Sequence, residues 1–232
     1  MNPTSSLNRF LRPLTRRLGL NRLLAKVIMR GAYEDRFGKA LEKEIKHGDV
    51  VWDVGANVGL YTTIFLDLVG TDGYVIAFEP TLACYGKLRE KCANYPNALL
   101  HNVAMGEKDG TVAMSIEADQ LAATHRIVKA QDSEREVIEV SIRSADSFAR
   151  EFPANFPNII KVDVEGHEGS VIDGMDTVLS DRRLRCVGVE VHFGLLDERG
   201  ESHRPKMLED AFIRHDFVTF WTDPSHLIAR RS

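Results

Sequence analysis

The side chains of this 232-residue chain that could perform chemistry lie where hydrophobic runs end. Five ionisable residues alternate with aliphatic ones in two such runs: Lys161, Asp163 and Glu165 in the first, Glu190 and His192 in the second. Because successive strand side chains point to opposite faces, the members of each group share a face. Buried charges are costly unless they are paired or functional. We take all five as candidate catalytic residues, although an ion pair would account for any one of them alone.

Imidazole and carboxylate groups at such a site could remove a proton or hold a cation. His192 and His167 are candidate bases, because imidazole titrates near neutral pH. Asp163 could act as a base, as a metal ligand or as the group that orients a histidine. Asp163 and Glu190 also offer hard oxygen ligands suited to Mg²⁺ or Mn²⁺. The sequence leaves metal binding open.

The segment 50–62 predicts a ligand-binding turn between a strand and a helix. A short hydrophobic strand reaches Asp53, and apolar residues with helical spacing follow Gly59. Gly55 and Gly59 bracket the turn, where the lack of a Cβ allows unusual backbone angles and close approach of a ligand. Asn57 takes the place of the glycine that admits a pyrophosphate in dinucleotide sites. The turn predicts a nucleoside ligand without a pyrophosphate, such as S-adenosylmethionine; an ordinary structural turn is the alternative.

A second hydrophobic run, Tyr74–Phe78, also ends at a carboxylate, Glu79. Glu79 lies twenty residues beyond Gly59, the distance at which an acidic side chain meets the ribose in nucleotide-binding βαβ units. A carboxylate can accept hydrogen bonds from both hydroxyls of a ribose diol. Asp53 and Glu79 together therefore strengthen the prediction of a nucleoside site.

The elements that position these residues follow from the alternation of short apolar runs with segments of helical periodicity. The apolar runs are residues 50–54, 74–78, 98–104, 158–164 and 186–193. This alternation predicts an α/β fold with a parallel sheet. The carboxyl ends of parallel strands meet at one edge, and such sheets bind ligands there.

Residues 111–116 and 137–142 show strand-like alternation and predict an antiparallel pair. The segment 117–136 between them is polar and has no apolar periodicity. A connection of this length is usually functional or disordered. We interpret it as a mobile lid or substrate loop, with a solvated connection as the alternative.

Charge is distributed unevenly along the chain. Residues 1–30 carry seven basic and no acidic side chains, whereas the remainder has 23 basic and 34 acidic ones, a net charge of −11. So acidic a body argues against a nucleic-acid partner. The basic, apolar N-terminal pattern fits an amphipathic helix on an anionic membrane surface, a targeting segment, or a helix that covers the domain. It has no apolar run long enough to span a bilayer.

The three cysteines are odd in number and lack metal-ligand spacing; they are Cys84, Cys92 and Cys186. They predict buried thiols in a reducing compartment, and hence a cytoplasmic protein. Peripheral membrane contact through residues 1–30 is an additional prediction from their basic, apolar pattern.

Four segments make the sequence similar to a known family. They read VVWDVGANVGLYT (50–62), VIAFEP (75–80), HNVAMGEKDG (101–110) and IIKVDVEGHEGSVIDGM (159–175). The chain resembles the FkbM-type family of S-adenosylmethionine-dependent methyltransferases over roughly residues 45–195. The spacing of Lys161, Asp163, Glu165 and Gly166 is its most distinctive part, since the glycine turn is shared by most methyltransferases.

The resemblance implies a Rossmann-like class I methyltransferase fold. Its seven-stranded, mostly parallel sheet would end in an antiparallel strand pair, formed here by residues 216–221 and 225–230. The methyltransferase domain would cover residues 31–232, with additional helices at the N-terminus. It also implies that Glu79 holds the cofactor ribose and that Asn102 and Val103 lie by the adenine. The full set of implied cofactor-binding residues is Asp53, Gly55, Ala56, Asn57, Gly59, Tyr61, Thr62, Glu79, Pro80, Asn102 and Val103.

The resulting functional hypothesis is O-methylation of a hydroxyl group on a sugar, glycan or hydroxylated natural product. Two alternatives stay open from the sequence. One is a nicotinamide-dependent oxidoreductase, against which the missing glycine of the fingerprint counts. The other is a methyltransferase-like fold that only binds, against which the intact Asp53, Glu79 and Asp163 argue. The acceptor and the oligomeric state do not follow from the sequence.

Overall fold

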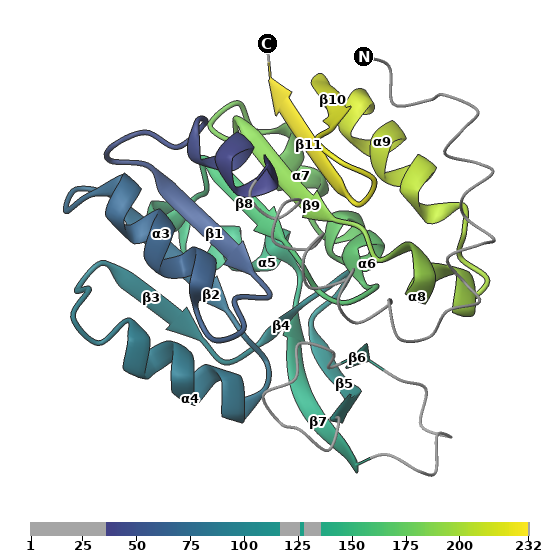
Figure 1. Ribbon diagram of the computed structural model, residues 1–232, viewed down its shortest axis with the longest axis horizontal. Coiled ribbons are helices and arrows are strands. Elements are labelled where there is room, and N and C mark those ends of the chain that lie inside the picture. Colours follow the sequence, from purple (N-terminus) through teal and green to yellow (C-terminus); the bar gives the residue numbers. More distant parts are fainter. Residues whose placement is uncertain (1–35, 117–125, 128–135, 232) are drawn as a thin grey trace, which may run out of the picture.

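The computed structural model describes residues 36–116, 126–127 and 136–231, and its centre is a twisted seven-stranded sheet (Figure 1). In spatial order the strands are β10 (Phe217–Trp221), β11 (His226–Arg231), β9 (Cys186–Glu190), β8 (Ile159–Val162), β1 (Val50–Val54), β2 (Tyr74–Phe78) and β3 (Ala98–His101). β11 runs antiparallel to both of its neighbours, and the pairs from β9 to β3 are parallel. This confirms the predicted Rossmann-like sheet, including the antiparallel strand near its end.

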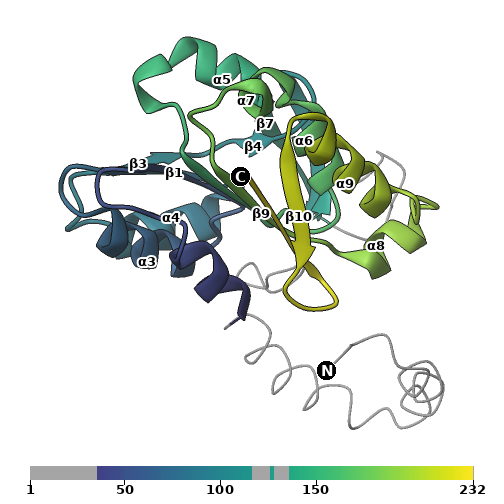
Figure 2. The same cartoon turned by 90° about the horizontal axis from the view of Figure 1, so that it is seen from above.

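Helices cover both faces of the sheet (Figure 2). They are α3 (Leu60–Val69), α4 (Leu82–Lys91), α5 (Ala145–Glu151), η2 (Pro153–Asn155), α6 (Glu168–Asp173), α7 (Asp176–Ser180), α8 (Phe193–Glu198) and α9 (Arg204–Arg214), with a further helix at residues 36–42. The helix at 36–42, α3 and α4 pack on one face, and α5, α6, α7 and α9 pack on the other.

The central strand β1 shows how the sequence creates these two cores. Val51 points into the core that contains Phe65 of α3, whereas Trp52 points into the opposite core against Phe148 of α5. Both β1 side chains are fully buried, so the strand is apolar on both faces, as expected for a central parallel strand. The exception is Asp53, which shares the face of Val51 and is also fully buried.

A smaller sheet lies beside the main one, with the strand order β4 (Ala104–Met105), β7 (Glu136–Arg143), β5 (Gly110–Ile116) and β6 (Arg126–Ile127). β5 and β7 are antiparallel, as predicted. The short strand β6 falls inside the segment 117–136, which was predicted to contain no strand, and it pairs with the edge of β5. Residues 117–125 and 128–135 of the predicted lid lie outside the described residues, so the lid stays a prediction.

The helix predicted after Gly166 is two helices, α6 and α7, separated at Gly174. A Cβ at Gly174 would lie 2.1 Å from the carbonyl oxygen of Gly106, so the chain passes too close to the smaller sheet for a side chain there. The Asp146 carboxylate accepts hydrogen bonds from the first backbone N–H groups of α7, at Thr177 and Val178. These bonds satisfy donors that a new helix start leaves open.

Other predictions fall partly or wholly outside the described part of the chain. One of the helices expected near the start of the domain is present at residues 36–42, with Phe37 and Leu41 buried against the sheet. Residues 1–30 are not described, so their three interpretations stay predictions. Among the described residues, the helices are too short and too polar to cross a bilayer. The three cysteines are buried thiols that form no disulfide with any described residue, as expected.

Candidate active site

A cavity of about 320 Å³ opens where the parallel strands end. Its walls come from the turn after β1, from residues that follow β2 and β3, from the loop after β8 and from the last residue of β9. β1 lies between β8 and β2. From β1 the chain adds β2 and β3 on one side of the sheet, and it later adds β8 and β9 on the other side, so the strand order reverses here. Ligands of open α/β sheets bind at such a switch point.

The glycine turn after β1 was expected to allow close approach of a ligand, but its glycines are also required by contacts with other parts of the protein. Gly55 and Asn57 have positive φ values of 78° and 52°. A Cβ at Gly55 would lie 1.8 Å from the carbonyl oxygen of Asp163, so the neighbouring loop, rather than a ligand alone, requires a glycine there. At Gly59, φ is 82° and a Cβ would lie 2.7 Å from Leu88 of α4. Both glycines therefore bring elements of the site together.

Glu79 is buried at the cavity wall and its carboxylate is held in place. One oxygen accepts from the backbone N–H of Asn57 at 2.9 Å, and the other from the backbone N–H and hydroxyl of Thr81 at 2.9 and 2.6 Å. These bonds join the turn after β1 to the turn after β2. Their rigidity suits an acceptor that must meet a diol in one orientation.

The structure brings seven of the eleven predicted cofactor residues to the cavity: Gly55, Ala56, Asn57, Tyr61, Glu79, Pro80 and Val103. The other four support it from outside its lining. Thr62 donates to the fully buried Asp53 at 2.6 Å. Gly59 packs against α4. Asn102 donates to the backbone carbonyls of Glu79 and Pro80 at 2.8 and 2.9 Å, which holds the turn after β2.

Several cavity residues carried no signal in the sequence. Met105 follows β3, Cys84 lies in α4, and Met114 comes from β5 of the smaller sheet. Each is an apolar residue within an ordinary hydrophobic pattern. Only the tertiary arrangement, which places the smaller sheet beside the carboxyl edge of the main one, brings them to the cavity.

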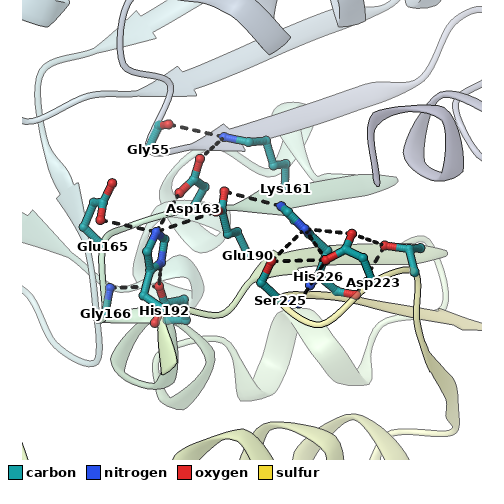
Figure 3. Close-up of polar contacts among 12 residues, drawn as sticks. Gly55, Lys161, Asp163, Glu165, Gly166, Glu190, His192, Asp223, Ser225 and His226 are labelled. Atoms are coloured by element: carbon teal, nitrogen blue, oxygen red, sulfur yellow. Dashed lines mark hydrogen bonds and ion pairs between the residues drawn. The ribbon is translucent and has the colours of Figure 1, made fainter. Parts of the chain in front are cut away.

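Lys161 is a buried cation that joins β8 to β1. Its Nζ lies 3.1 Å from Asp53. It also lies 3.5 Å from Asp163 and 3.3 Å from the carbonyl oxygen of Gly55 (Figure 3). Burial alone would lower the pKa of the ammonium, but Asp53 and Asp163 outweigh it, so the pKa lies above its ordinary value. Lys161 therefore stays charged and cannot serve as a base near neutral pH.

His192 lies among four carboxylates (Figure 3). Its Nδ1 is 2.6 Å from Glu168, and its Nε2 is 3.2 Å from Glu165, 3.8 Å from Glu190 and 3.9 Å from Asp163. Burial disfavours the imidazolium, but the hydrogen bond and charge of Glu168 and the other carboxylates outweigh it and raise the pKa of His192 to about 9. In this apo arrangement His192 is protonated at neutral pH, so it is a poor base.

His167 lines the cavity, and its pKa is shifted in the opposite direction to that of His192. Burial, and then the charge of Arg199, lower the pKa of His167 to about 4. Arg199 can only donate, so its guanidinium at 3.0 Å makes Nδ1 of His167 the acceptor and leaves the proton on Nε2. His167 is thus a neutral donor, and the environment of neither histidine favours the role of base that its residue type suggested.

Asp163 lies at the cavity wall with its side chain half-buried. Burial raises the pKa of Asp163, Lys161 opposes this increase, and the nearby charge of Glu190 adds to it. Raised basicity and access to the cavity make Asp163 the carboxylate best suited to accept a proton.

Glu190 is held by a pair of residues that the sequence did not reveal. The Nε2 of His226 lies 3.5 Å from Glu190, and its Nδ1 lies 2.8 Å from Asp223. Burial raises the pKa of Glu190, but the contact with His226 and the charges of His192 and His226 outweigh it and lower the pKa to about 2. Glu190 therefore stays ionised. His226 begins the antiparallel strand β11, and its proximity to β9 depends on that pairing alone.

Three features together define a Rossmann-like class I methyltransferase. They are the seven-stranded sheet with its antiparallel β11, the cavity at the switch point, and Glu79 held by hydrogen bonds at the cavity wall. Residues 53–218 match the methyltransferase FkbM domain, which is more than half of the chain. The chain belongs to the FkbM family of S-adenosylmethionine-dependent methyltransferases. This confirms the resemblance and decides against the nicotinamide-dependent oxidoreductase.

Two curated relatives extend over most of the chain. It is 29% identical over 195 residues to the hexuronic acid methyltransferase AglP of Haloferax volcanii, a match that covers 83% of this chain and 75% of AglP. It is 28% identical to the 31-O-demethyl-FK506 methyltransferase FkbM of Streptomyces tacrolimicus over 72% of this chain and 75% of that protein.

Solved structures share the fold at low sequence identity. An FkbM methyltransferase from Methylobacillus flagellatus superposes with a TM-score of 0.52 at 17% identity over 78% of this chain and 43% of that one. A Streptococcus mutans protein in complex with SAH has a TM-score of 0.52 at 12% identity over 84% of this chain and 95% of that one.

Proposed function

We propose that this protein transfers the methyl group of S-adenosylmethionine to a hydroxyl oxygen of a sugar, glycan or hydroxylated natural product. The observation that carries the proposal is a single cavity with two chemically distinct ends. Asn57 and Glu79 form a polar end suited to a nucleoside, and Asp163, Glu165 and Glu190 form an acidic end. The relatives AglP and FkbM, named for a hexuronic acid and an O-demethylated natural product, support a hydroxylated acceptor.

The residues of the first end fit the cofactor. In the proposed complex the Glu79 carboxylate accepts hydrogen bonds from the ribose diol, as a carboxylate held by Asn57 and Thr81 can do without rearrangement. Buried apolar side chains in the same cavity, among them Val103 and Met105, offer a surface for the purine. Asp53 and Thr62 act indirectly, by holding Lys161 and the start of α3.

The residues of the second end fit the acceptor. The bound cofactor supplies a methyl group that is already activated, so the protein must align the acceptor oxygen and remove its proton. A sugar hydroxyl is a weak nucleophile at neutral pH and needs a base or a metal. In the metal-free form, a carboxylate oxygen of Asp163 accepts the proton as the hydroxyl oxygen is methylated. The Nε2–H group of His167 can donate a hydrogen bond to another oxygen atom of the molecule that is methylated.

A divalent cation, Mg²⁺ or Mn²⁺, remains part of the proposal. The sequence suggested Asp163 and Glu190 as its ligands. Glu190 is instead engaged by His226, so a different set of ligands is argued in the next subsection.

The experiment that tests the function uses deuterated-methyl S-adenosylmethionine and a panel of hydroxylated acceptors that includes free and glycosidic hexuronic acids. We expect mass spectrometry to find the labelled methyl group as an ether on one acceptor with the wild-type chain and not with Asp163→Asn; a methyl ester would contradict transfer to a hydroxyl oxygen. Cofactor binding without transfer to any acceptor in the panel or in cell extracts would instead favour a subunit that only binds.

A further inference from the structure

We propose that Asp163, Glu165 and His192 bind one divalent transition-metal cation, with Mn²⁺ the best-matched probe, at the acidic end of the cavity. This inference rests on the proposed function and deepens it by adding a metal site to the acceptor end. Each of the three residues offers one ligand atom, and these atoms lie within 4.8 Å of one another.

The distances between the ligand atoms suit one ion. The Nε2 of His192 lies 3.2 Å from Oε2 of Glu165 and 3.9 Å from Oδ1 of Asp163. Ligand atoms about 2.1 Å from a cation are about 3.0 Å apart when adjacent in an octahedron and about 4.2 Å apart when opposite. Both separations from His192 fall within this range, and all three ligand atoms lie within 4.8 Å of one another, so side-chain movements can close the site around a cation.

The orientation of His192 provides an independent argument. Its Nδ1 lies 2.6 Å from Glu168, a carboxylate whose side chain is fully buried and which also accepts from the backbone N–H of Gly166. Metal-binding histidines typically donate their second ring nitrogen to a carboxylate in this way, which aims the other nitrogen at the metal. Glu168 thus directs Nε2 toward Glu165 and Asp163 (Figure 3).

The second oxygen of Glu168 strengthens this argument. It is buried, and among the described residues it has no hydrogen-bond partner. A fully buried carboxylate needs a positively charged or metal-bound partner to offset its desolvation. The first oxygen of Glu168 has such a partner in the imidazole of His192, which it also orients.

The charge around the site also favours a cation. Asp163, Glu165 and Glu190 converge on the same side of His192 (Figure 3). The Nζ of Lys161 lies closer to the buried Asp53, at 3.1 Å, than to Asp163, at 3.5 Å, so Lys161 offsets only part of this negative charge. A divalent ion would neutralise the converging carboxylates, and the imidazole ligand favours Mn²⁺ or a later transition metal over Mg²⁺.

The position of the site gives the cation a part in catalysis. Asp163 and Glu165 line the cavity, so coordination positions not filled by the protein face the acceptor. A hydroxyl bound to a divalent cation is more acidic than a free one. The cation would displace the proton from Nε2 of His192 to solvent, because a metal-bound histidine is neutral. With the ion bound, Asp163 would act as a ligand rather than as the base, and the hydroxyl proton would leave to water at the cavity mouth.

The test titrates the metal-stripped, full-length protein with Mn²⁺ and measures free Mn²⁺ by electron paramagnetic resonance. We expect one saturable site per chain. Glu165→Gln and His192→Gln each remove a ligand and should weaken binding by more than about 100-fold, whereas Glu168→Gln, which only positions His192, should weaken it by about 10–100-fold.

The matched control is His215→Gln. His215 is also half-buried, and its Nε2 lies 3.0 Å from a single carboxylate, Asp176, away from the cavity. This variant should leave Mn²⁺ affinity unchanged. Asp163→Asn provides a second ligand variant in case Glu165→Gln does not fold.

Calorimetry with S-adenosylhomocysteine separates the metal site from the proposed function. Wild-type protein that binds S-adenosylhomocysteine but shows no saturable Mn²⁺ site would overturn the metal proposal and leave the methyltransferase proposal intact. Equal Mn²⁺ affinity in the wild type and in folded ligand variants would also overturn it. Failure of the wild type to bind S-adenosylhomocysteine would count against the proposed function instead.

Discussion

Replacement of Lys161 by methionine tests how the site is held together. Lys161 is 2% exposed, and its Nζ lies 3.1 Å from Asp53, which is fully buried. Lys161→Met keeps a side chain of similar length but leaves the Asp53 charge buried without its cation. Removing one partner of a buried ion pair typically costs about 3–5 kcal/mol in the free energy of unfolding. For a domain of this size, that loss corresponds to a fall in Tm of about 6–20 °C.

The assay is urea denaturation followed by tryptophan fluorescence, since Trp52 is fully buried in the core beside this strand. The double variant Lys161→Met with Asp53→Asn removes both charges and keeps an acceptor for the Thr62 hydroxyl. It should be more stable than Lys161→Met alone. Lys206→Met, which breaks an exposed ion pair with Asp210 on α9, serves as the control and should cause no measurable change.

Two results would refute this reasoning. One is a loss smaller than about 1 kcal/mol in Lys161→Met, which would mean that water or another group compensates Asp53. The other is a double variant less stable than the single one, which would show that the pair does not act as a unit.

Three further predictions concern the site and its surroundings. Asp163→Asn should lower kcat by about 10²–10⁴ and leave the affinity for S-adenosylmethionine unchanged, because it removes the proton acceptor or metal ligand; an unchanged kcat would exclude both roles. Gly55→Ala should lower the free energy of unfolding by more than about 1 kcal/mol, measured by urea denaturation, because φ is 78° and the new Cβ meets the carbonyl of Asp163; wild-type stability would contradict the packing described. Removal of residues 1–30 should leave cofactor affinity intact in calorimetry, because the lining found among the described residues begins at Val54 and already contains the predicted ribose ligand Glu79; a large loss would place that segment at the site.

The sequence predicted those features that depend on local pattern. Each parallel strand of the main sheet was visible as a hydrophobic run, and the polar residues at the ends of these strands marked the edge where the cavity lies. The antiparallel pair β10 and β11 was expected only from the family resemblance. Glu79 could be found because its distance from Gly59 along the chain reflects the length of one helix and one strand. Such features can be recognised in the sequence because a βαβ unit is built from segments that are neighbours along the chain.

Features that depend on contacts between distant segments could not be predicted. The approach of the Gly55 turn to the carbonyl of Asp163 joins positions more than a hundred residues apart, and nothing local marks it. The break between α6 and α7 depends on Gly106 in the same way. His226 reaches Glu190 only because β11 inserts beside β9.

The histidines show a second limit, which concerns charge rather than position. His167 and His192 have the same intrinsic pKa, so the sequence made both candidate bases. Burial and then the charge of Arg199 lower the pKa of His167 to about 4, whereas Glu168 and the other carboxylates outweigh burial at His192 and raise its pKa to about 9. Protonation states at such a site depend on neighbours that the sequence does not identify.

The most direct test of the central claim, that the cavity binds S-adenosylmethionine through Glu79 and the turn after β1, is a calorimetric titration of the wild-type chain with that cofactor. We predict a single site with micromolar affinity, about −7 to −8 kcal/mol. Absence of heat from S-adenosylmethionine, or tighter binding of NAD, would contradict the claim.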